Sequence, residues 1–278
     1  MCLACDFRFG PVRGRRAFLF AAGAAVAAPA LAQVEVGEAS VARNLVPAEN
    51  IERAGVQQYH QLLAQARAKG LLAPDGNAQL QRLRAIASKI IPYTAQWNPR
   101  AAAWKWEVNL IASKQINAFC MPGGKIAFFT GILDQLKLSD DEVAMVMGHE
   151  MAHALREHAR ARLAKNAGTG AALSIAAQLL GLGQAGDLAA RAGTQLITLK
   201  FSRSDETDAD LVGLELAARA GYDPKASVSL WTKMAKASKS EGALGFLSTH
   251  PSGPDRIKVL QANLPKVEGL SGRLQRGG

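Results

Sequence analysis

The chain has 278 residues and a net charge of +10 at pH 7, with 49% hydrophobic and 20% charged residues. This composition is ordinary for a globular protein, and the length is ample for a buried core. Lysine and arginine do not cluster among aromatic residues, which argues against a nucleic-acid-binding protein. The basic surface is compatible with peripheral contact to an anionic membrane.

Residues 1–32 have the three-part pattern of a secretory signal. Arg13–Arg16 supply positive charge, Ala17–Ala28 form an apolar stretch, and Ala30-Leu31-Ala32 matches an A-x-A cleavage site. The arginine pair in the charged region also resembles a twin-arginine signal, which exports folded proteins. We expect this segment to be removed after about Ala32, which gives a periplasmic mature protein. A general secretory signal and a retained N-terminal anchor are the alternatives.

Cysteine usage predicts a fold without disulfides. Cys2 and Cys5 fall in the signal segment, which leaves Cys120 as the single cysteine of residues 33–278. Because no intramolecular disulfide can then form, we expect residues 33–278 to fold as a single domain that depends on its hydrophobic core. A buried thiol is the usual state of such a cysteine.

Hydrophobic periodicity predicts two helices before a small sheet. Apolar residues recur with helical spacing over Ala48–Lys69 and Ala78–Ile91, and they alternate with polar residues from Trp104 to Lys114, as in a half-buried strand. Lys125–Thr130 is expected to form another strand, and the turn Pro122–Gly124 before it favours antiparallel pairing. The pattern predicts an α+β fold that is mainly helical, with a small antiparallel sheet.

The range Ser139–Arg162 is expected to be a single helix that starts with an S-x-x-E capping box. Inside it, His149 and His153 lie four residues apart and therefore on one face, where their imidazoles can hold one zinc ion. Glu150 lies beside them and can activate a water molecule. This H-E-x-x-H pattern is specific in its helical setting, but zinc still requires a third protein ligand.

The segment 167–193 is rich in Ala, Gly and Leu. Its apolar run, Ala171–Leu182, is shorter than the roughly 20 residues that span a bilayer. We expect a buried or surface-lying helical hairpin. A mobile lid over the active site and a membrane-touching element are the alternatives.

Periodicity farther along the chain predicts three more helices, which end at Ala220, cover Lys225–Lys239 and cover Asp255–Asn263. The loop His250-Pro251-Ser252-Gly253-Pro254 separates the last two.

Two positions are candidates for the third ligand. On a continuous helix, His158 is rotated by about 140° from His153, so we expect a surface histidine or one that supports a ligand from behind. Glu206 opens a later helix, and Asp210 lies one turn on, so both carboxylates share a face. Such a helix, packed on the metal helix, would complete a site of two histidines and one glutamate with one position left for water. An acidic helix start that only complements the helix dipole is the alternative.

Four segments form a set of motifs: Asn117-Ala118-Phe119 with Pro122-Gly123-Gly124, His149–His153 with Arg156-Glu157-His158, Phe201-Ser202-Arg203 with Glu206 and Ala209-Asp210, and Thr249-His250-Pro251 with Arg256-Ile257. In this order they resemble the zinc metalloprotease family that includes the CAAX prenyl endopeptidase, the heat-shock protease HtpX and the periplasmic protease BepA. The resemblance extends from about Val41 to Leu264. It is closest to short, soluble, envelope-located members.

The resemblance implies a zincin-like, gluzincin-type metalloprotease domain with one zinc ion per chain. The implied zinc ligands are His149, His153 and Glu206. Glu150 is implied as the general base, and Asp210 as a second acid that donates a proton or orients a ligating histidine. His250 could approach the zinc from its loop as an extra ligand, or it could be an ordinary loop histidine.

The expected function is zinc-dependent hydrolysis of misfolded or unassembled cell-envelope proteins. An extended substrate would pair with the sheet edge near Asn117 and Ala118 through main-chain hydrogen bonds. The alternative is a zinc-binding chaperone or assembly factor that holds envelope proteins without cutting them, if His250 or the segment 167–193 occludes the metal. The oligomeric state stays open.

Overall fold

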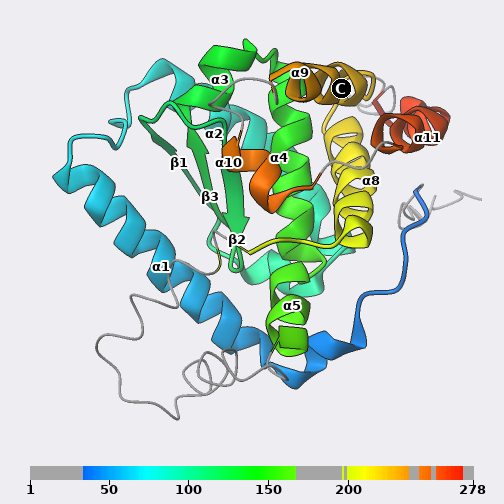
Figure 1. The fold of residues 1–278 in the computed structure, drawn as a ribbon, viewed down its shortest axis with the longest axis horizontal. Helices are drawn as coiled ribbons and strands as arrows, with labels where there is room; N and C mark the ends of the chain where they lie inside the picture. The colour runs from blue at the N-terminus through cyan, green and yellow to red at the C-terminus, as the bar shows by residue number, and fades with distance from the viewer. Residues whose placement is uncertain (1–33, 167–195, 197–198, 238–243, 252–254, 272–278) are drawn as a thin grey trace, which may run out of the picture. The chain divides into compact units, whose positions relative to one another are not determined.

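A computed structural model describes these residues of the chain: 34–166, 196, 199–237, 244–251 and 255–271 (Figure 1). They belong to one compact unit, Ala32–Gly278. The expected signal segment 1–32 and the Ala/Gly/Leu-rich segment 167–193 lie outside the described residues. Within the described ranges, no helix has both the length and the apolar character needed to cross a bilayer.

Three short strands form one sheet in the order β1 (Glu107–Ile111), β3 (Lys125–Phe129), β2 (Ala118–Met121). β2 and β3 are antiparallel across the turn Pro122–Gly124, as predicted. β1 pairs with β3 in parallel, so the complete sheet is mixed. This order places β2 at one edge of the sheet. Figure 1 shows that β2 is the strand nearest to the central helix α4 (Asp140–Leu155).

Helices cover both faces of the sheet. On one face, α1 (Ala48–Ala68) packs against alternate side chains of the strands, such as Phe119 and Met121. On the other face, α2 (Ala78–Ile90) and α4 pack against the side chains in between, such as Ala118 and Ile126. Cys120 also points to this second face, and its thiol is buried as predicted.

The prediction of a half-buried strand over Trp104–Lys114 was wrong in extent and in exposure. β1 begins only at Glu107, and its polar residue Asn109 is buried. The side-chain amide of Asn109 donates to the hydroxyl of Tyr59 at 3.0 Å. α1 therefore supplies both the apolar cover and the hydrogen bond that this polar side chain needs.

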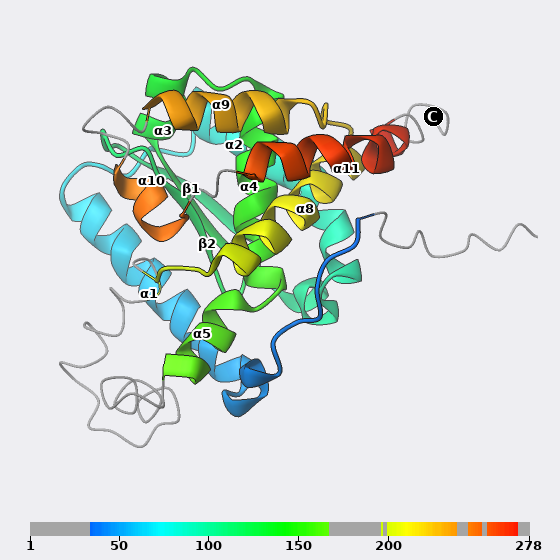
Figure 2. The same ribbon diagram turned by 45° about the vertical axis from the view of Figure 1, so that its right-hand side comes forward.

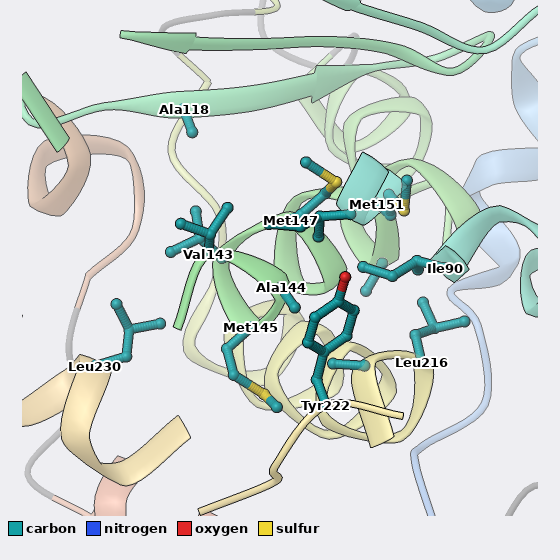
Figure 3. Close-up of a cluster of buried hydrophobic side chains, with 14 of the residues drawn as sticks. Ile90, Ala118, Val143, Ala144, Met145, Met147, Met151, Leu216, Tyr222 and Leu230 are labelled. Carbon is teal, nitrogen blue, oxygen red and sulfur yellow. The ribbon is translucent and has the colours of Figure 1, made fainter. Parts of the chain in front are cut away.

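α4 lies at the centre of the core. The predicted capping box is present: the Ser139 hydroxyl accepts from the Glu142 N–H, and the Glu142 carboxylate accepts from the Ser139 N–H. Every residue from Glu142 to Leu155 is buried. Figure 3 shows Met147 and Met151 of this helix among side chains from α2 and α8 (Arg203–Arg219). Figure 2 shows α8 beside α4, on the side away from the sheet.

α4 and α8 approach each other closely at Gly148 and Gly213. A methyl group on Gly148 would lie 2.6 Å from the Gly213 carbonyl oxygen, and one on Gly213 would lie 2.5 Å from the His149 nitrogen. Both distances are far shorter than van der Waals contact, so only glycine fits at either position. The crossing places His149 directly beside α8.

The prediction of a single helix over Ser139–Arg162 was wrong. α4 ends at Leu155, and a second helix, α5 (His158–Asn166), follows it. Between them Glu157 has a φ of 56°, a left-handed conformation that a right-handed helix cannot contain. Two arginines form ion pairs with the Glu157 carboxylate, Arg160 at 2.7 Å and Arg43 at 3.3 Å.

The remaining elements are shorter or peripheral. They are η1 (Val41–Leu45), η2 (Ile91–Gln96), η3 (Pro99–Ala103), α3 (Thr130–Leu136), α9 (Ala226–Ala237), α10 (Leu244–Thr249) and α11 (Arg256–Ser271). The helix predicted to end at Asn263 continues as α11 to Ser271. The buried side chains of Val267 and Leu270 extend its apolar stripe past Pro265, and their burial stabilises the longer helix.

Replacement of Gly213 by alanine should destabilise the fold, because the added methyl group would push α8 away from α4. We expect the free energy of unfolding to fall by about 1–3 kcal/mol, the usual range for overpacking. Urea denaturation followed by circular dichroism measures this change.

Gly269→Ala is the matched control, since Gly269 lies in α11 and no atom lies within 4 Å of the added methyl group. This substitution should leave the free energy of unfolding unchanged or raise it by up to about 1 kcal/mol. Equal effects of the two substitutions would contradict the close helix crossing.

Candidate metal centre

Two imidazoles on successive turns of α4 form the first half of the centre. His149 and His153 are both buried, and their Nε2 atoms are 3.2 Å apart. The Phe201 ring stacks on His153 with a centroid distance of 3.9 Å, which restricts the plane of that imidazole. α4 therefore directs two ring nitrogens to one point.

α8 brings a carboxylate to the same point. Ser202 and Asp205 form a capping box that starts this helix, which puts Glu206 at its N-terminal end. Glu206 Oε1 is 3.4 Å from His153 Nε2, and Glu206 Oε2 is 3.6 Å from His149 Nε2. The three residues expected as ligands thus lie in one buried cluster.

His250 is the fourth member of this cluster. It follows α10, where the Phe246 carbonyl accepts from the His250 N–H and the Phe246 ring stacks on the imidazole at 4.3 Å. His250 Nδ1 is 3.3 Å from His149 Nε2 and 3.0 Å from Glu206 Oε1. The four donor atoms all lie within 4.8 Å of one another. Of the two roles expected for His250, an extra ligand or an ordinary loop histidine, its position fits the extra ligand.

The spacing of these donors suits a metal ion. A tetrahedral zinc site with bonds of about 2.0–2.2 Å separates neighbouring donor atoms by about 3.3–3.6 Å. The separations given above range from 3.0 to 3.6 Å. Two imidazole nitrogens that face each other at this distance need a shared proton or a cation between them. Imidazole with carboxylate suits zinc or a related transition metal better than magnesium or calcium.

A second layer of charged residues holds the ligands in place. His149 Nδ1 is 3.0 Å from Asp210 Oδ1, so its Nε2 faces the cluster. Arg256 of α11 donates from Nη2 to Asp210 Oδ1 at 2.8 Å, and the same nitrogen lies 3.0 Å from Glu206 Oε2. The guanidinium also lies over the Trp231 ring of α9 at 3.3 Å. Arg256 thereby joins two carboxylates that would otherwise repel each other.

The surroundings favour ionised Glu206 and Asp210 and a neutral His153. Burial acts to raise the pKa of Glu206, but hydrogen bonds with His153 and His250 outweigh it and hold that pKa well below 4.5. At Asp210 burial is likewise outweighed, chiefly by the charge of Arg256, and the pKa is lowered. Burial lowers the pKa of His153 to about 3, so this imidazole is neutral. Anionic carboxylate and neutral imidazole are the forms that bind a metal cation.

Glu150 lies next to the donor cluster but is not part of it. Its carboxyl group is buried, and burial raises its pKa above 4.5 against the opposing charges of His250 and His149. In the described part of the chain, Glu150 Oε1 has no hydrogen-bond partner, and it lies 3.5 Å from His250 Nε2. A buried carboxylate with a raised pKa and a free acceptor oxygen has the properties of a general base.

A cavity of about 30 Å³ lies between Glu150 and the edge of the sheet. Asn117 and Ala118, the residues expected to bind substrate, line it together with His153 and His250. The Ala118 N–H donates to Asn117 Oδ1 at 3.0 Å. A cavity of this size holds about two water molecules and no peptide. The sheet edge is therefore adjacent to the cluster.

Two supporting residues have only a weak signal in the sequence. Arg256 stands in one of the quoted motifs, yet its contacts with Asp210 and Glu206 depend on the packing of α11. His158 was expected to be either a surface histidine or a histidine that supports a ligand. Its Nδ1 lies 3.0 Å from His153 Nδ1, so it is the supporting histidine. The rotation of about 140° that a continuous helix would give does not apply, because the chain turns at Glu157.

Comparison with known proteins extends these observations. The family model of peptidase family M48 matches residues 77–264. The chain is 42% identical over 161 residues to mitochondrial metalloendopeptidase OMA1 of Arabidopsis thaliana, a match that covers 57% of this chain and 32% of that protein. It is 39% identical over 166 residues to OMA1 of Schizosaccharomyces pombe, with 59% and 48% covered. It is 27% identical over 199 residues to metalloprotease LoiP of Escherichia coli, with 69% and 73% covered.

The chain spans between about a third and about half of the length of these two OMA1 relatives. The range matched by the family model exceeds half of the chain and contains the whole donor cluster together with Glu150. The chain therefore belongs to peptidase family M48.

Proposed function

We propose that the chain is a zinc-dependent endopeptidase. The observation that carries this proposal is the convergence of His149, His153 and Glu206 beside the buried carboxyl group of Glu150. Membership of peptidase family M48 and the names of the OMA1 relatives support it. We propose zinc, one ion per chain, because two histidines and a glutamate with an adjacent acid–base glutamate form a common ligand set of zinc peptidases.

A zinc ion held by His149, His153 and Glu206 would polarise the scissile carbonyl and lower the pKa of the attacking water molecule. Glu150 would accept a proton from that water and pass it to the leaving amine, a role that its raised pKa favours. Asp210 accepts a hydrogen bond from the Nδ1–H group of His149, which leaves Nε2 as the ligand atom. Because Arg256 and His149 occupy the Asp210 carboxylate, we assign it this orienting role rather than proton donation.

The edge of β2 is the proposed site for the substrate main chain. The Asn117 carbonyl accepts from the Phe129 N–H, so the main-chain groups of Asn117 face β3. In a strand, the N–H and C=O groups of the next residue, and of every second residue after it, point the opposite way, here away from β3. Those residues are Ala118 and Cys120, which line the cavity beside Glu150. Strand addition at this edge reads the main chain and tolerates many side chains, but it requires an extended peptide. This requirement supports misfolded or unassembled proteins as substrates.

The cell envelope is the proposed location of the protein and of these substrates. The support is the pattern of residues 1–32, with its arginines, apolar stretch and A-x-A site. The OMA1 relatives have mitochondrial names, which describe those proteins. The proposed location therefore depends on the export signal.

A second function is favoured by the position of His250. Its Nδ1 lies 3.3 Å from His149 Nε2 and 3.0 Å from Glu206 Oε1, which suits a fourth ligand. Zinc sites with four protein ligands are typically structural, whereas catalytic sites keep one position open. If His250 stays in this position, the protein would be a zinc-binding chaperone or assembly factor that does not cut. In that arrangement, hydrolysis would need His250 to leave the cluster and open one position for water.

Glu206→Gln should weaken zinc binding by more than about 100-fold, because a neutral amide replaces an anionic ligand and the loss exceeds that of an outer hydrogen-bond partner. Competition with a chelator measures the affinity, and the zinc content after dialysis supports it. The matched control is Glu38→Gln, the same change at an exposed glutamate, which should bind zinc as the wild type does. Unchanged binding in Glu206→Gln would remove this residue from the ligand set.

Glu150→Gln should lower the rate of cleavage by about 100- to 10,000-fold, since the general base is lost while the shape of the side chain is kept. Digestion of casein or of an unfolded outer-membrane protein, with zinc present, measures the rate. Zinc content should stay at the wild-type level. Wild-type protein that cuts no faster than this variant would exclude the peptidase and favour the non-cleaving function.

Fractionation of cells that express a C-terminally tagged full chain should recover the protein in the periplasmic fraction without residues 1–32. Replacement of Arg15 and Arg16 by lysine separates the two export routes, because a twin-arginine signal depends on the arginine pair. Tagged protein that keeps residues 1–32 and remains in the cytoplasm would contradict the proposed location.

A further inference from the structure

We propose that His158 is a positioning residue, which holds His153 for the metal through a single hydrogen bond. This inference deepens the proposed zinc site and rests on it. Nothing in the H-E-x-x-H pattern assigns a partner to the second histidine, and the turn between α4 and α5 supplies one.

The ring nitrogens of the two histidines define the hydrogen bond. His153 Nε2 faces the donor cluster at 3.4 Å from Glu206 Oε1, and His153 Nδ1 faces His158 Nδ1 at 3.0 Å. A neutral histidine that binds a metal through Nε2 carries its proton on Nδ1. His153 is therefore the donor, and His158 must accept with an unprotonated Nδ1. The proton of His158 is then on Nε2.

The far side of His158 faces a carboxylate that fits this tautomer. His158 Nε2 is 4.0 Å from Asp208 Oδ2, and Arg156 Nη2 holds the same oxygen at 2.9 Å. At 4.0 Å this carboxylate is too far away for a hydrogen bond, but its negative charge favours the proton on Nε2. Arg156 also donates to the carbonyl of Gly37, so the segment before η1 fixes the outer end of this chain of contacts.

The two metal-facing imidazoles thus receive different support. His149 donates to the carboxylate of Asp210, which makes it a more basic ligand. His153 faces another imidazole instead of a carboxylate, with Nδ1 at 3.0 Å from His158 Nδ1. The contribution of His158 is therefore mainly directional. It keeps the ring of His153 in the plane that points Nε2 at the cluster.

The turn at Glu157 makes this contact possible. On a continuous helix, His158 would be rotated by about 140° from His153, and its ring could not reach the ligand. The left-handed conformation of Glu157 interrupts that helix, and His158 Nδ1 lies 3.0 Å from His153 Nδ1. His158 is buried there, and the Phe201 ring lies 3.9 Å from the His153 ring and 6.2 Å from the His158 ring.

The test compares three variants of the full chain, His158→Asn, His158→Gln and His158→Leu, by zinc affinity in chelator competition. Asparagine places an acceptor oxygen near the position of Nδ1, glutamine places its amide near that of Nε2, and leucine has no acceptor. We expect the asparagine variant to bind zinc within about threefold of wild type and the other two to bind about 10- to 100-fold more weakly, the usual loss for such a partner. The visible absorption of the cobalt-substituted protein should change in the glutamine and leucine variants alone.

A role in packing alone predicts the opposite order, with leucine closest to wild type because it buries no polar atom. That order, or equal zinc affinity in all three variants and wild type, would overturn the proposal. Circular dichroism checks that each variant is folded. If the leucine variant is not folded, the zinc affinities of the asparagine and glutamine variants are compared instead. Wild-type protein that binds no zinc would refute the proposed metal site itself, whereas firm wild-type binding with unaffected variants refutes only the role of His158.

Discussion

The contact of α4 with α8 at Gly148 and Gly213 is the constraint on which the metal centre depends. Packed helices usually keep their axes about 8–10 Å apart because side chains separate them. Here neither helix has a side chain at the crossing, and the two backbones touch. Glu206 and Asp210 precede Gly213 on α8 by two turns and one turn, so both carboxylates reach the face of α4 that carries the imidazoles. A wider crossing would leave the metal short of its carboxylate ligand.

Charge balance is the second requirement of this centre. Glu150, Glu206 and Asp210 are all buried, and an isolated buried carboxylate costs several kcal/mol. Arg256 offsets part of that cost by contact with two of them, and its stacking on Trp231 fixes the guanidinium where both can be reached. A bound divalent cation would supply the remaining positive charge. α9 and α11 therefore belong to the centre as much as the helices that carry the donor atoms.

Features that depend only on residues close together in the sequence could be predicted. The capping box at Ser139, the antiparallel turn before β3 and the common face of the H-E-x-x-H histidines each follow from local spacing, and the structure has all three. The turn at Glu157 could not be predicted, because neither glycine nor proline marks it. The places of His250 and Arg256 depend on how α10 and α11 pack against the rest of the fold. The parallel pairing of β1 is likewise a property of the whole chain.

The contact between His149 and Arg256 shows that the centre is a property of the folded chain. These residues are 107 positions apart in the chain, and their side chains lie 3.4 Å from each other. Closing a loop of this length costs conformational entropy, which the packing of the complete fold has to offset. The candidate ligands likewise come from α4, α8 and the residue after α10, so the complete donor set exists only in the folded chain. A metal ion that binds this set would therefore stabilise the folded state over the unfolded one.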